Sequence, residues 1–408
     1  MEQYDVVVVG GGIAGSALAA RLASNGVRVL VLERQTVFRD KVRGEFMHVW
    51  GAAEMLQLGL EDVLLEAGGG YCTTLVGYNE GQDPAVAEAS AVPLAMLVPD
   101  VAGAMCVGHP QASEALNSHA ARCGADVRRG VGDVEVEAGP TPSVRYELDG
   151  EIHEVTCRLL IGADGRQSTV RKGLRIGIEQ VESKAALGGM LVRAPDWPSD
   201  VSMTGTEGDR HFLAFPRPNG FVRLYVARIP GPTTAGANRA QHMLDDFRLT
   251  CVPGSERLAS AEPVGPCSYY IGIDSWTDGP VVDGAVLIGD AAGWSDPILG
   301  EGLSVAMRDA RAVSDVLLAG DDWSPAAFDS YVEERAERMR RLKIIGHIVT
   351  EIRCTFTPEG RDRRVRFGEL LATDPLVLGI MIGALAGPEQ SPAEAFDDAN
   401  VDKILAFA

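Results

Sequence analysis

Lysine is scarce in this chain of 408 residues, and most of its positive charge is carried by arginine. Aspartate and glutamate outnumber lysine and arginine by 57 to 37, so the formal net charge is −20. A chain this acidic is repelled by nucleic acid and by anionic lipid surfaces. We therefore expect neither nucleic acid nor a membrane as its main partner.

The chain also lacks paired cysteines and long apolar runs. Its seven cysteines are scattered, with no C-x-x-C pair and no spacing typical of a metal site. Such a set is typical of reduced thiols, so we expect a cytoplasmic protein without a metal ion. Residues 375–386 are apolar but too short to cross a bilayer, and they predict a buried helix. The first residues, MEQYD, lead directly into a predicted strand, and we expect no signal peptide.

Residues 4–34 carry the strongest pattern in the chain. The apolar run Val6–Val9 predicts a strand that is buried on both faces, and a glycine-rich turn follows it directly. A helix of small residues is predicted over 14–24, and a second buried strand over 27–32. This order of strand, turn, helix and strand is typical of a unit that binds a dinucleotide.

The turn reads Gly10-x-Gly12-x-x-Gly15. The first glycine allows the tight turn, the second lets the backbone approach a pyrophosphate, and the third lets helix and strand pack closely. The N-terminus of the helix then faces the phosphates. Glu33 ends the second strand, where a carboxylate accepts hydrogen bonds from an adenosine ribose. These features predict a dinucleotide site without distinguishing NAD from FAD.

Two later segments repeat the pattern of an apolar strand that breaks into an Asp-containing turn. Residues 159–171 run into Gly162-Ala163-Asp164-Gly165, and residues 286–310 run into Gly289-Asp290-Ala291-Ala292. The second of these turns continues toward a predicted helix through Pro297, Gly300 and Gly302.

The ordered set of three motifs resembles the single-component, class A FAD-dependent monooxygenases, the p-hydroxybenzoate-hydroxylase-like family. It is similar also to their relatives, the flavin halogenases and the geranylgeranyl reductases. The resemblance extends from residue 4 to about residue 340. It implies an α/β fold: a Rossmann-like FAD-binding domain of the glutathione-reductase type, an interleaved antiparallel-sheet substrate domain, and C-terminal helices. The expected boundaries are 1–75, 104–185 and 278–325 for the FAD-binding domain, 76–103 and 186–277 for the substrate domain, and 326–408 for the C-terminal helices.

The resemblance also implies contacts with non-covalently bound FAD. Asp290 is expected to bind a ribityl hydroxyl, and Pro297 to lie against the isoalloxazine. Backbone N–H groups around Gly302 and Leu303 are expected at the N1–C2=O edge, where a helix N-terminus suits the negative charge of reduced flavin. The other residues expected at the cofactor are Gly10, Gly12, Ala14, Gly15, Glu33, Arg34, Arg43, His109, Asp164 and Gly300.

Three positions depart from the commonest form of the family. Gly293 stands where a histidine is usual, and Ser304 where an asparagine is usual. His109 stands where relatives usually carry an arginine that contacts FAD. Gly293, together with the Gly300-Glu301-Gly302 sequence, points toward the reductase branch.

Substrate contacts are expected near the flavin and on the predicted antiparallel sheet. The candidates are Met47, Trp50, His211 and Phe215, although packing in a core explains each of them equally well. Phe212 is a further apolar candidate under the same alternative.

Two residues are candidates for catalysis. His48 follows the segment expected to approach the flavin, and a neutral imidazole near its ordinary pKa takes a proton from a phenol. A structural histidine is the alternative. Pro297 is expected beside the flavin, near the position where oxygen reacts.

Three functions fit these motifs. The first is a monooxygenase that uses FAD, NADH or NADPH, and O2 to hydroxylate or epoxidise an aromatic or polyketide-like small molecule through a C4a-hydroperoxyflavin. The second is a halogenase or a geranylgeranyl-reductase-like enzyme, which would need a separate reductase partner. The third is a binding protein that shares the fold without flavin. A homodimer is left open.

Overall fold

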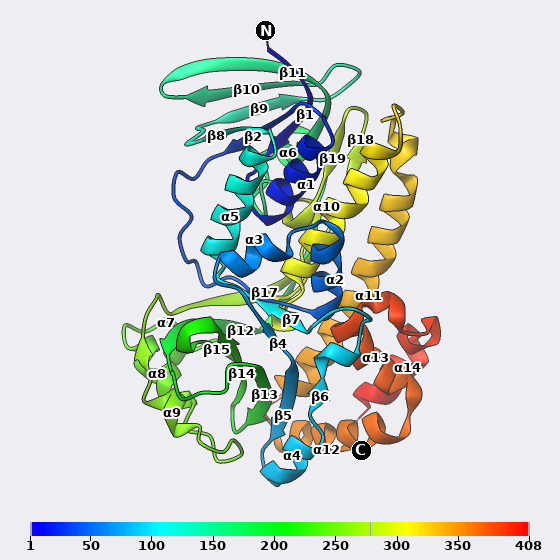
Figure 1. Ribbon diagram of the computed structural model, residues 1–408. Coiled ribbons are helices and arrows are strands. Elements are labelled where there is room, and N and C mark those ends of the chain that lie inside the picture. Colours follow the sequence, from blue (N-terminus) through cyan, green and yellow to red (C-terminus); the bar gives the residue numbers. More distant parts are fainter. Residues whose placement is uncertain (1, 278, 407–408) are drawn as a thin grey trace.

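The computed structural model describes residues 2–277 and 279–406. Figure 1 shows an upper half that carries the N-terminus and a lower half that carries the C-terminus. An eight-stranded sheet forms the centre of the upper half, and a second eight-stranded sheet lies in the lower half beside a group of C-terminal helices. A three-stranded sheet, formed by β3 (Phe46–Met47), β4 (Gly70–Cys72) and β7 (Ala104–Cys106), lies between the two halves.

The centre of the first sheet is parallel. Strand β1 (Glu2–Val9) pairs in parallel with both β2 (Val29–Glu33) and β11 (Glu151–Gly162). Alternate valines of β1 enter two different cores, one on each face of the sheet. This explains why the strand is apolar throughout. The sheet is completed by β8 (Asp126–Arg129), β9 (Val134–Glu137), β10 (Ser143–Leu148), β18 (Val281–Val282) and β19 (Ala285–Leu287).

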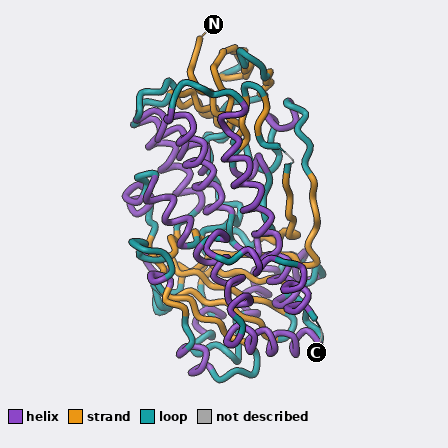
Figure 2. The backbone as a smooth tube through the Cα atoms, turned by 90° about the vertical axis from the view of Figure 1, so that its right-hand side faces the viewer, coloured by secondary structure: helices purple, strands orange, loops and turns teal. Residues whose placement is uncertain are grey.

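Three helices cover one face of this sheet. Helix α1 (Ile13–Ser24) packs against α5 (His109–Arg122) and α10 (Gly302–Ala319), and Figure 2 shows helices of the upper half side by side in one layer. The predicted helix over 14–24 is confirmed, and its many small residues explain how closely its neighbours approach. The second strand is confirmed as β2, which begins two residues later than expected and ends one residue later.

The second sheet is mainly antiparallel. Strands β14 (Arg210–Arg217) and β15 (Phe221–Arg228) form a hairpin, closed by η2 (Pro218–Gly220), in which Asn219 has a φ of +65°. One face of the sheet packs on α8 (Arg239–Asp246) and α9 (Glu256–Ala259). Its other strands are β5 (Thr74–Asn79), β6 (Val92–Pro93), β12 (Glu179–Arg193), β13 (Val201–Glu207), β16 (Glu262–Pro263) and β17 (Ser268–Trp276).

The C-terminal helices form a core of their own beside the second sheet. They are α11 (Asp329–Arg353), α12 (Pro358–Thr373), α13 (Pro375–Ala386) and α14 (Asp398–Leu405). Helix α13 is the buried helix that the sequence predicts over 375–386. Within the described residues, no single helix is long and apolar enough to cross a membrane, and α12 and α13 reach that length only as a pair bent by 96°.

A buried carboxylate joins α10 and α11 to the turn that follows β19. Asp309 is fully buried and accepts hydrogen bonds from Arg335 at 2.9 Å and from Arg338 at 2.7 Å. It also accepts the N–H of Gly289 at 2.8 Å. Burial alone would raise the pKa of Asp309, but the charges of the two arginines outweigh it and lower the pKa.

Arg335 also holds the same turn directly. Its guanidinium donates to the carbonyl oxygens of Gly289, Ala292 and Gly293 at 3.0–3.2 Å. A planar guanidinium with five donors suits this task, because it satisfies several buried carbonyl groups at once. The turn η3 (Gly289–Ala292) is therefore held by α11, a helix more than forty residues further along the chain.

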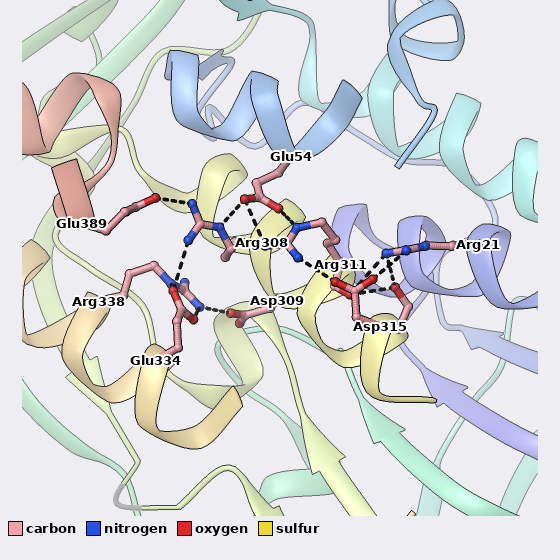
Figure 3. Close-up of polar contacts among 10 residues, drawn as sticks. Arg21, Glu54, Arg308, Asp309, Arg311, Asp315, Glu334, Arg338 and Glu389 are labelled. Carbon is pink, nitrogen blue, oxygen red and sulfur yellow. Dashed lines mark hydrogen bonds and ion pairs between the residues drawn. The ribbon is translucent and has the colours of Figure 1, made fainter. Parts of the chain in front are cut away.

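Further ion pairs join α10 to its neighbours (Figure 3). Glu54 of α2 (Val49–Gln57) is almost fully buried and pairs with both Arg308 and Arg311 of α10. Asp315, near the other end of α10, pairs with Arg21 of α1 at 2.6 Å. These contacts fix three helices relative to one another.

We expect Asp309→Asn to destabilise the fold strongly. The substitution removes the negative charge that faces two buried arginines, and breaking a buried ion pair costs about 3–5 kcal/mol. The matched control is Asp315→Asn, because this carboxylate lies on the same helix but is 43% exposed, and its loss should cost about 0–1 kcal/mol. Urea unfolding of both variants measures the difference, and equal losses would contradict a special role for Asp309.

Candidate active site

The glycine-rich turn is tightly packed at three positions and open at one. Gly10 has a φ of +107°, and a Cβ there would lie 2.3 Å from the carbonyl oxygen of Ala163. A Cβ at Gly15 would lie 2.0 Å from the carbonyl oxygen of Gly10, and one at Gly11 would meet Asn117. At Gly12, by contrast, an added Cβ meets no protein atom within 4 Å. The turn thus leaves room at the position where a pyrophosphate is expected.

The carboxylate of Glu33 stabilises this turn through hydrogen bonds. It accepts the N–H of Gly11 and the N–H of Gln35, both at 2.7 Å. Asn117 of α5 donates to the carbonyl of Gly11 at 3.3 Å and also to Ser16, whose hydroxyl donates to the same carbonyl at 2.9 Å. Sequence reasoning missed Asn117, because nothing local to α5 reveals a partner more than a hundred residues away.

The three motifs converge on one region. The packing of Gly10 on Ala163 brings the second motif against the first. A Cβ on Gly289 would lie 3.2 Å from that of Ala14, so the third motif also touches the first. Arg171 donates to the carbonyl of Ala291 at 2.9 Å and joins the second motif to the third. The sequence predicts each motif separately, and the structure brings them together.

Asp164 is engaged locally. Its carboxylate accepts the hydroxyl of Ser168 at 2.5 Å and the N–H groups of Thr169 and Val170 at 2.6 and 3.2 Å. It therefore holds the start of the short helix α6 (Thr169–Gly173). Its expected contact with the cofactor stays a prediction.

Three of the expected cofactor residues share one electrostatic environment. Burial and the charge of Arg43 together lower the pKa of His109 to about 4, and the charge of Asp290 opposes this shift. Asp290 also accepts a hydrogen bond from Arg166 at 3.2 Å. These residues come from segments far apart in the sequence. Arg34 is exposed, and its place beside the adenine stays a prediction.

His48 contacts the loop that leads into α10. Its Nε2 lies 2.8 Å from the carbonyl oxygen of Leu299, in η4 (Pro297–Leu299), and the ring lies beside Gly300. Burial lowers the pKa of His48 to about 4, although this hydrogen bond opposes the shift. The pKa thus differs from the near-neutral value expected from the sequence, because the ring is withdrawn from water.

Glu301 is a neighbour of His48 that the sequence did not single out as a site residue. Its side chain is fully buried, with one carboxyl oxygen 3.0 Å from the indole nitrogen of Trp50 and the other 3.7 Å from His48 Nε2. Burial raises its pKa well above the ordinary value, although the hydrogen bond from Trp50 opposes this. The carboxyl group therefore favours its neutral, protonated form next to a neutral imidazole.

The start of α10 lies directly after Glu301. Gly302 is exposed, an added Cβ there would meet no protein atom within 4 Å, and Leu303 is buried. The first N–H groups of a helix have no partner within the helix, so this end offers free donors. Negative charge is favoured at such an end.

The candidate substrate residues differ in accessibility. Met47 and Trp50 are each 1% exposed and lie in two of the hydrophobic cores. Phe215 is partly exposed and stacks on Phe46 with ring centroids 4.5 Å apart. His211 is buried on the second sheet, and Phe212 lies in the core beneath that sheet. The packing of Met47, Trp50 and Phe212 accounts for these residues without a substrate, whereas Phe215 is only partly buried.

An ion-pair cluster anchors the segment before His48 to the second sheet. Arg223 is fully buried and donates to Glu45 and to Asp40, at 2.7 Å in each case. Arg217 pairs with Glu45 at 3.1 Å, and the hydroxyl of Tyr225 donates to the carbonyl of Arg43 at 2.9 Å. The backbone that carries Arg43 is therefore held by the sheet.

The residues present fit FAD. The only loose position in the first turn, Gly12, is the one that must admit a pyrophosphate, and Gly302 leaves a second opening at the start of α10. Within residues 2–277 and 279–406, no group of three or more His, Cys, Asp or Glu side chains is placed to hold a metal ion.

A family model described as an FAD binding domain matches residues 3–343. The chain belongs to this FAD-binding family. The flavoprotein is 31% identical over 346 residues to a rifampicin monooxygenase from Streptomyces venezuelae, and the match covers 81% of this chain and 68% of that relative. The resemblance to class A FAD-dependent monooxygenases is confirmed, and the flavoprotein is an FAD-dependent oxidoreductase.

Solved structures share the fold of the flavoprotein. The p-nitrophenol 4-monooxygenase PnpA from Pseudomonas putida DLL-E4 has a TM-score of 0.80 and 19% identity, and the match covers 96% of this chain and 98% of that one. The flavin-dependent brominase Bmp2 has a TM-score of 0.74 and 18% identity, with 98% and 97% covered. At these identities the likeness concerns the fold alone. The predicted α/β fold class is confirmed, while the domain boundaries stay a prediction.

We expect Gly12→Val to abolish tight FAD binding without unfolding the protein. The new Cβ meets no protein atom, but the side chain occupies the space expected for the pyrophosphate. Affinity should fall at least about tenfold, which corresponds to about 1.4 kcal/mol. Gly15→Ala is the contrasting variant, because its Cβ clashes with the backbone of Gly10 and should destabilise the fold itself. FAD titration and urea unfolding of the apoproteins separate the two effects. A Gly12→Val protein that binds FAD normally would remove this turn from the site.

We expect His48→Gln to reduce the acid sensitivity of the fold. The unfolded imidazole takes up a proton below about pH 6.5, whereas the folded one resists protonation down to about pH 4. Wild-type stability is therefore lost as the pH falls through this window, by about 2 kcal/mol at pH 5. The variant should lack this loss. The control, His347→Gln, replaces an exposed histidine and should behave like wild type. Urea unfolding at pH 5 and pH 7 measures both, and identical slopes for wild type and His48→Gln would contradict the buried, neutral state.

Proposed function

We propose that this flavoprotein is a single-component monooxygenase. It takes electrons from NADH or NADPH and uses O2 to hydroxylate or epoxidise an aromatic or polyketide-like small molecule. The observation that carries the proposal is the convergence of three motifs on one open position, Gly12, with the loop of Pro297 leading into the start of α10. The similarity to a rifampicin monooxygenase supports the same activity and substrate class.

Bound FAD supplies hydride acceptance and oxygen activation, and the chain supplies binding and orientation. Gly12 admits the pyrophosphate, and Glu33 and Asp290 are our candidates for the ribose and ribityl hydroxyls. The N–H groups of Gly302 and Leu303, at the start of α10, would hold the flavin edge, and a helix N-terminus would suit the negative charge that reduced flavin carries. Arg43 and His109 are our candidates for binding the cofactor beside Asp290. The charges of Arg43 and Asp290 both act on His109, which supports this placement.

His48 and Pro297 are our candidates for the reacting end of the site. A neutral His48 fixes the backbone at Leu299, and its other ring nitrogen is free to interact with a substrate hydroxyl. Phe215 offers an apolar wall from the second sheet. The buried pair of His48 and Glu301 keeps the loop of Pro297 in a dry environment, which limits access of water.

A halogenase or a reductase of the same fold is the second candidate. The fold of a flavin-dependent brominase supports the first version, and the Gly300-Glu301-Gly302 sequence supports the second. Either would need electrons from a separate reductase partner. The flavin-free binding protein is not supported, because the chain belongs to an FAD-binding family.

We further propose a cytoplasmic location. All seven cysteines are free, and six of them are buried, which supports a reducing compartment. A homodimer stays a prediction.

The deciding experiment is an anaerobic titration of the purified holoprotein with NADPH and then NADH, followed by flavin absorption. Bleaching by either nucleotide, followed by reoxidation on admission of O2, is the expected result. The titration is repeated with aromatic and polyketide compounds present, because substrate can gate reduction. A flavin that no nucleotide bleaches under any of these conditions would favour the halogenase or reductase alternative. The Gly12→Val protein, which should lack flavin, controls for direct oxidation of the nucleotide by contaminants.

A further inference from the structure

A cation without a carboxylate partner lies at the end of α11. Arg353 is partly buried, and its guanidinium donates to the side-chain oxygen of Asn79 at 2.9 Å. Within residues 2–277 and 279–406, no carboxylate oxygen lies within 4.0 Å of it. Burial and the charge of Arg364 lower the pKa of Arg353 to about 10. A buried charge is costly unless it is paired, so an anion bound beside this arginine would stabilise it.

The surroundings of Arg353 are polar and positively charged. Arg364 of α12 donates to the carbonyl oxygen of Thr355 at 2.8 Å, and its charge acts on Arg353. The hydroxyl of Thr206 donates to the backbone carbonyl of Arg353 at 3.3 Å. The charge of Glu80 acts on Arg364, although Glu80 is itself paired with Arg361 at 3.0 Å. Among residues 2–277 and 279–406, no carboxylate forms an ion pair with Arg353 or Arg364.

His211 is a buried member of the same cluster. Its two ring nitrogens lie 3.4 Å from the hydroxyl of Thr204 and 3.3 Å from that of Thr206. Burial and the charge of Arg353 together lower the pKa of His211 to about 3. The ring is thus a neutral hydrogen-bonding group, and it is one of the residues that the sequence marks as a substrate contact.

The cluster lies on the same face of the second sheet as Phe215. Along β14, His211, Leu213 and Phe215 alternate with Phe212 and Ala214, which enter the core on the other side. Residues four apart on a strand are separated by about 13 Å. Phe215 lies near the reacting end, because it stacks on Phe46, whose ring is 5.0 Å from that of His48.

The face between these two ends is not filled by large side chains of the sheet. Leu213 and Thr204 are partly exposed. Gly77, opposite Thr204 on β5, leaves open space, because an added Cβ would meet nothing within 4 Å. The sheet itself therefore leaves room on this face beside Thr204 and Gly77.

We propose that Arg353, positioned by Asn79 and linked to His211 through Thr206, binds an oxyanion of the substrate, such as a carboxylate, about 13 Å along β14 from Phe215. The substrate is then an elongated molecule whose apolar end is oxidised near Phe215 while its anionic end is fixed at Arg353. A guanidinium suits this role because it binds a carboxylate through two parallel hydrogen bonds. The proposal rests on the proposed function for the position of the reacting end.

The test is calorimetric binding of 8-phenyloctanoate and of its methyl ester to the oxidised holoprotein. Wild type should bind the acid at least about tenfold more tightly than the ester, since each 1.4 kcal/mol is tenfold. Arg353→Gln should abolish this preference, and Arg353→Lys should restore part of it. The matched control is Arg340→Gln, which removes an exposed arginine of the same helix, paired only with Glu337 in the described residues. It should keep the full preference.

The proposal is overturned if wild type binds acid and ester equally, if it binds neither, or if Arg353→Gln keeps the preference. FAD content and thermal unfolding of each variant report on folding. Should Arg353→Gln fail to fold, Asn79→Ala, which removes the hydrogen-bond partner of Arg353, is expected to weaken the preference. Binding requires neither nucleotide nor O2. Suppose that wild type prefers the acid but that no nucleotide reduces its flavin. This result would overturn the proposed function and would still support the anion site.

Discussion

The buried carboxylate of Asp309 fixes α10 and α11 relative to the turn at Gly289. One charge, with no access to water, is balanced by two arginines and by a backbone N–H of the third motif. Arg335 then extends the same network to three carbonyl groups of that motif. Because each partner left alone would be a buried, unpaired polar group, the network is satisfied only when α10, α11 and the turn at Gly289 are all in place. Helix α11 thus contributes to the stability of the third motif.

A second buried ion pair fixes the segment before His48 relative to the second sheet. Glu45 and Arg223 are both fully buried, and their contact ties the segment that carries Arg43 and His48 to the second sheet. The segment that carries Arg43 and His48 and the second sheet are therefore not independent surfaces. A change in the tilt of the sheet would be transmitted to His48 through a charged contact with little freedom to adjust.

The local elements of this fold could be predicted from the sequence. The strand β1, the glycine turn and α1 are specified by neighbouring residues, as is the hairpin closed at Asn219, because backbone preference and apolar pattern act over a few positions. The resemblance of the three motifs was sufficient to predict FAD.

The long-range contacts could not be predicted. Glu45 and Arg223 are 178 positions apart, and Asp309 and Arg335 are 26 apart. In a chain with many acids and arginines, composition does not reveal which of them pair. The low pKa of His48 was missed for a related reason, since it follows from burial by distant segments. The sequence did not mark Glu301 as a site residue, because it stands out there only as the middle of Gly300-Glu301-Gly302. Its carboxyl group nevertheless lies next to His48.

The scattered cysteines have a practical consequence. Six of the seven are buried, and Cys123, at the C-terminal end of α5, is the partly exposed one. A thiol-reactive fluorophore or spin label should therefore attach at one position in the native protein, without any cysteine having to be removed. That position lies on the helix whose first residue is His109, so a reporter there would follow movements of the cofactor region from its outer end.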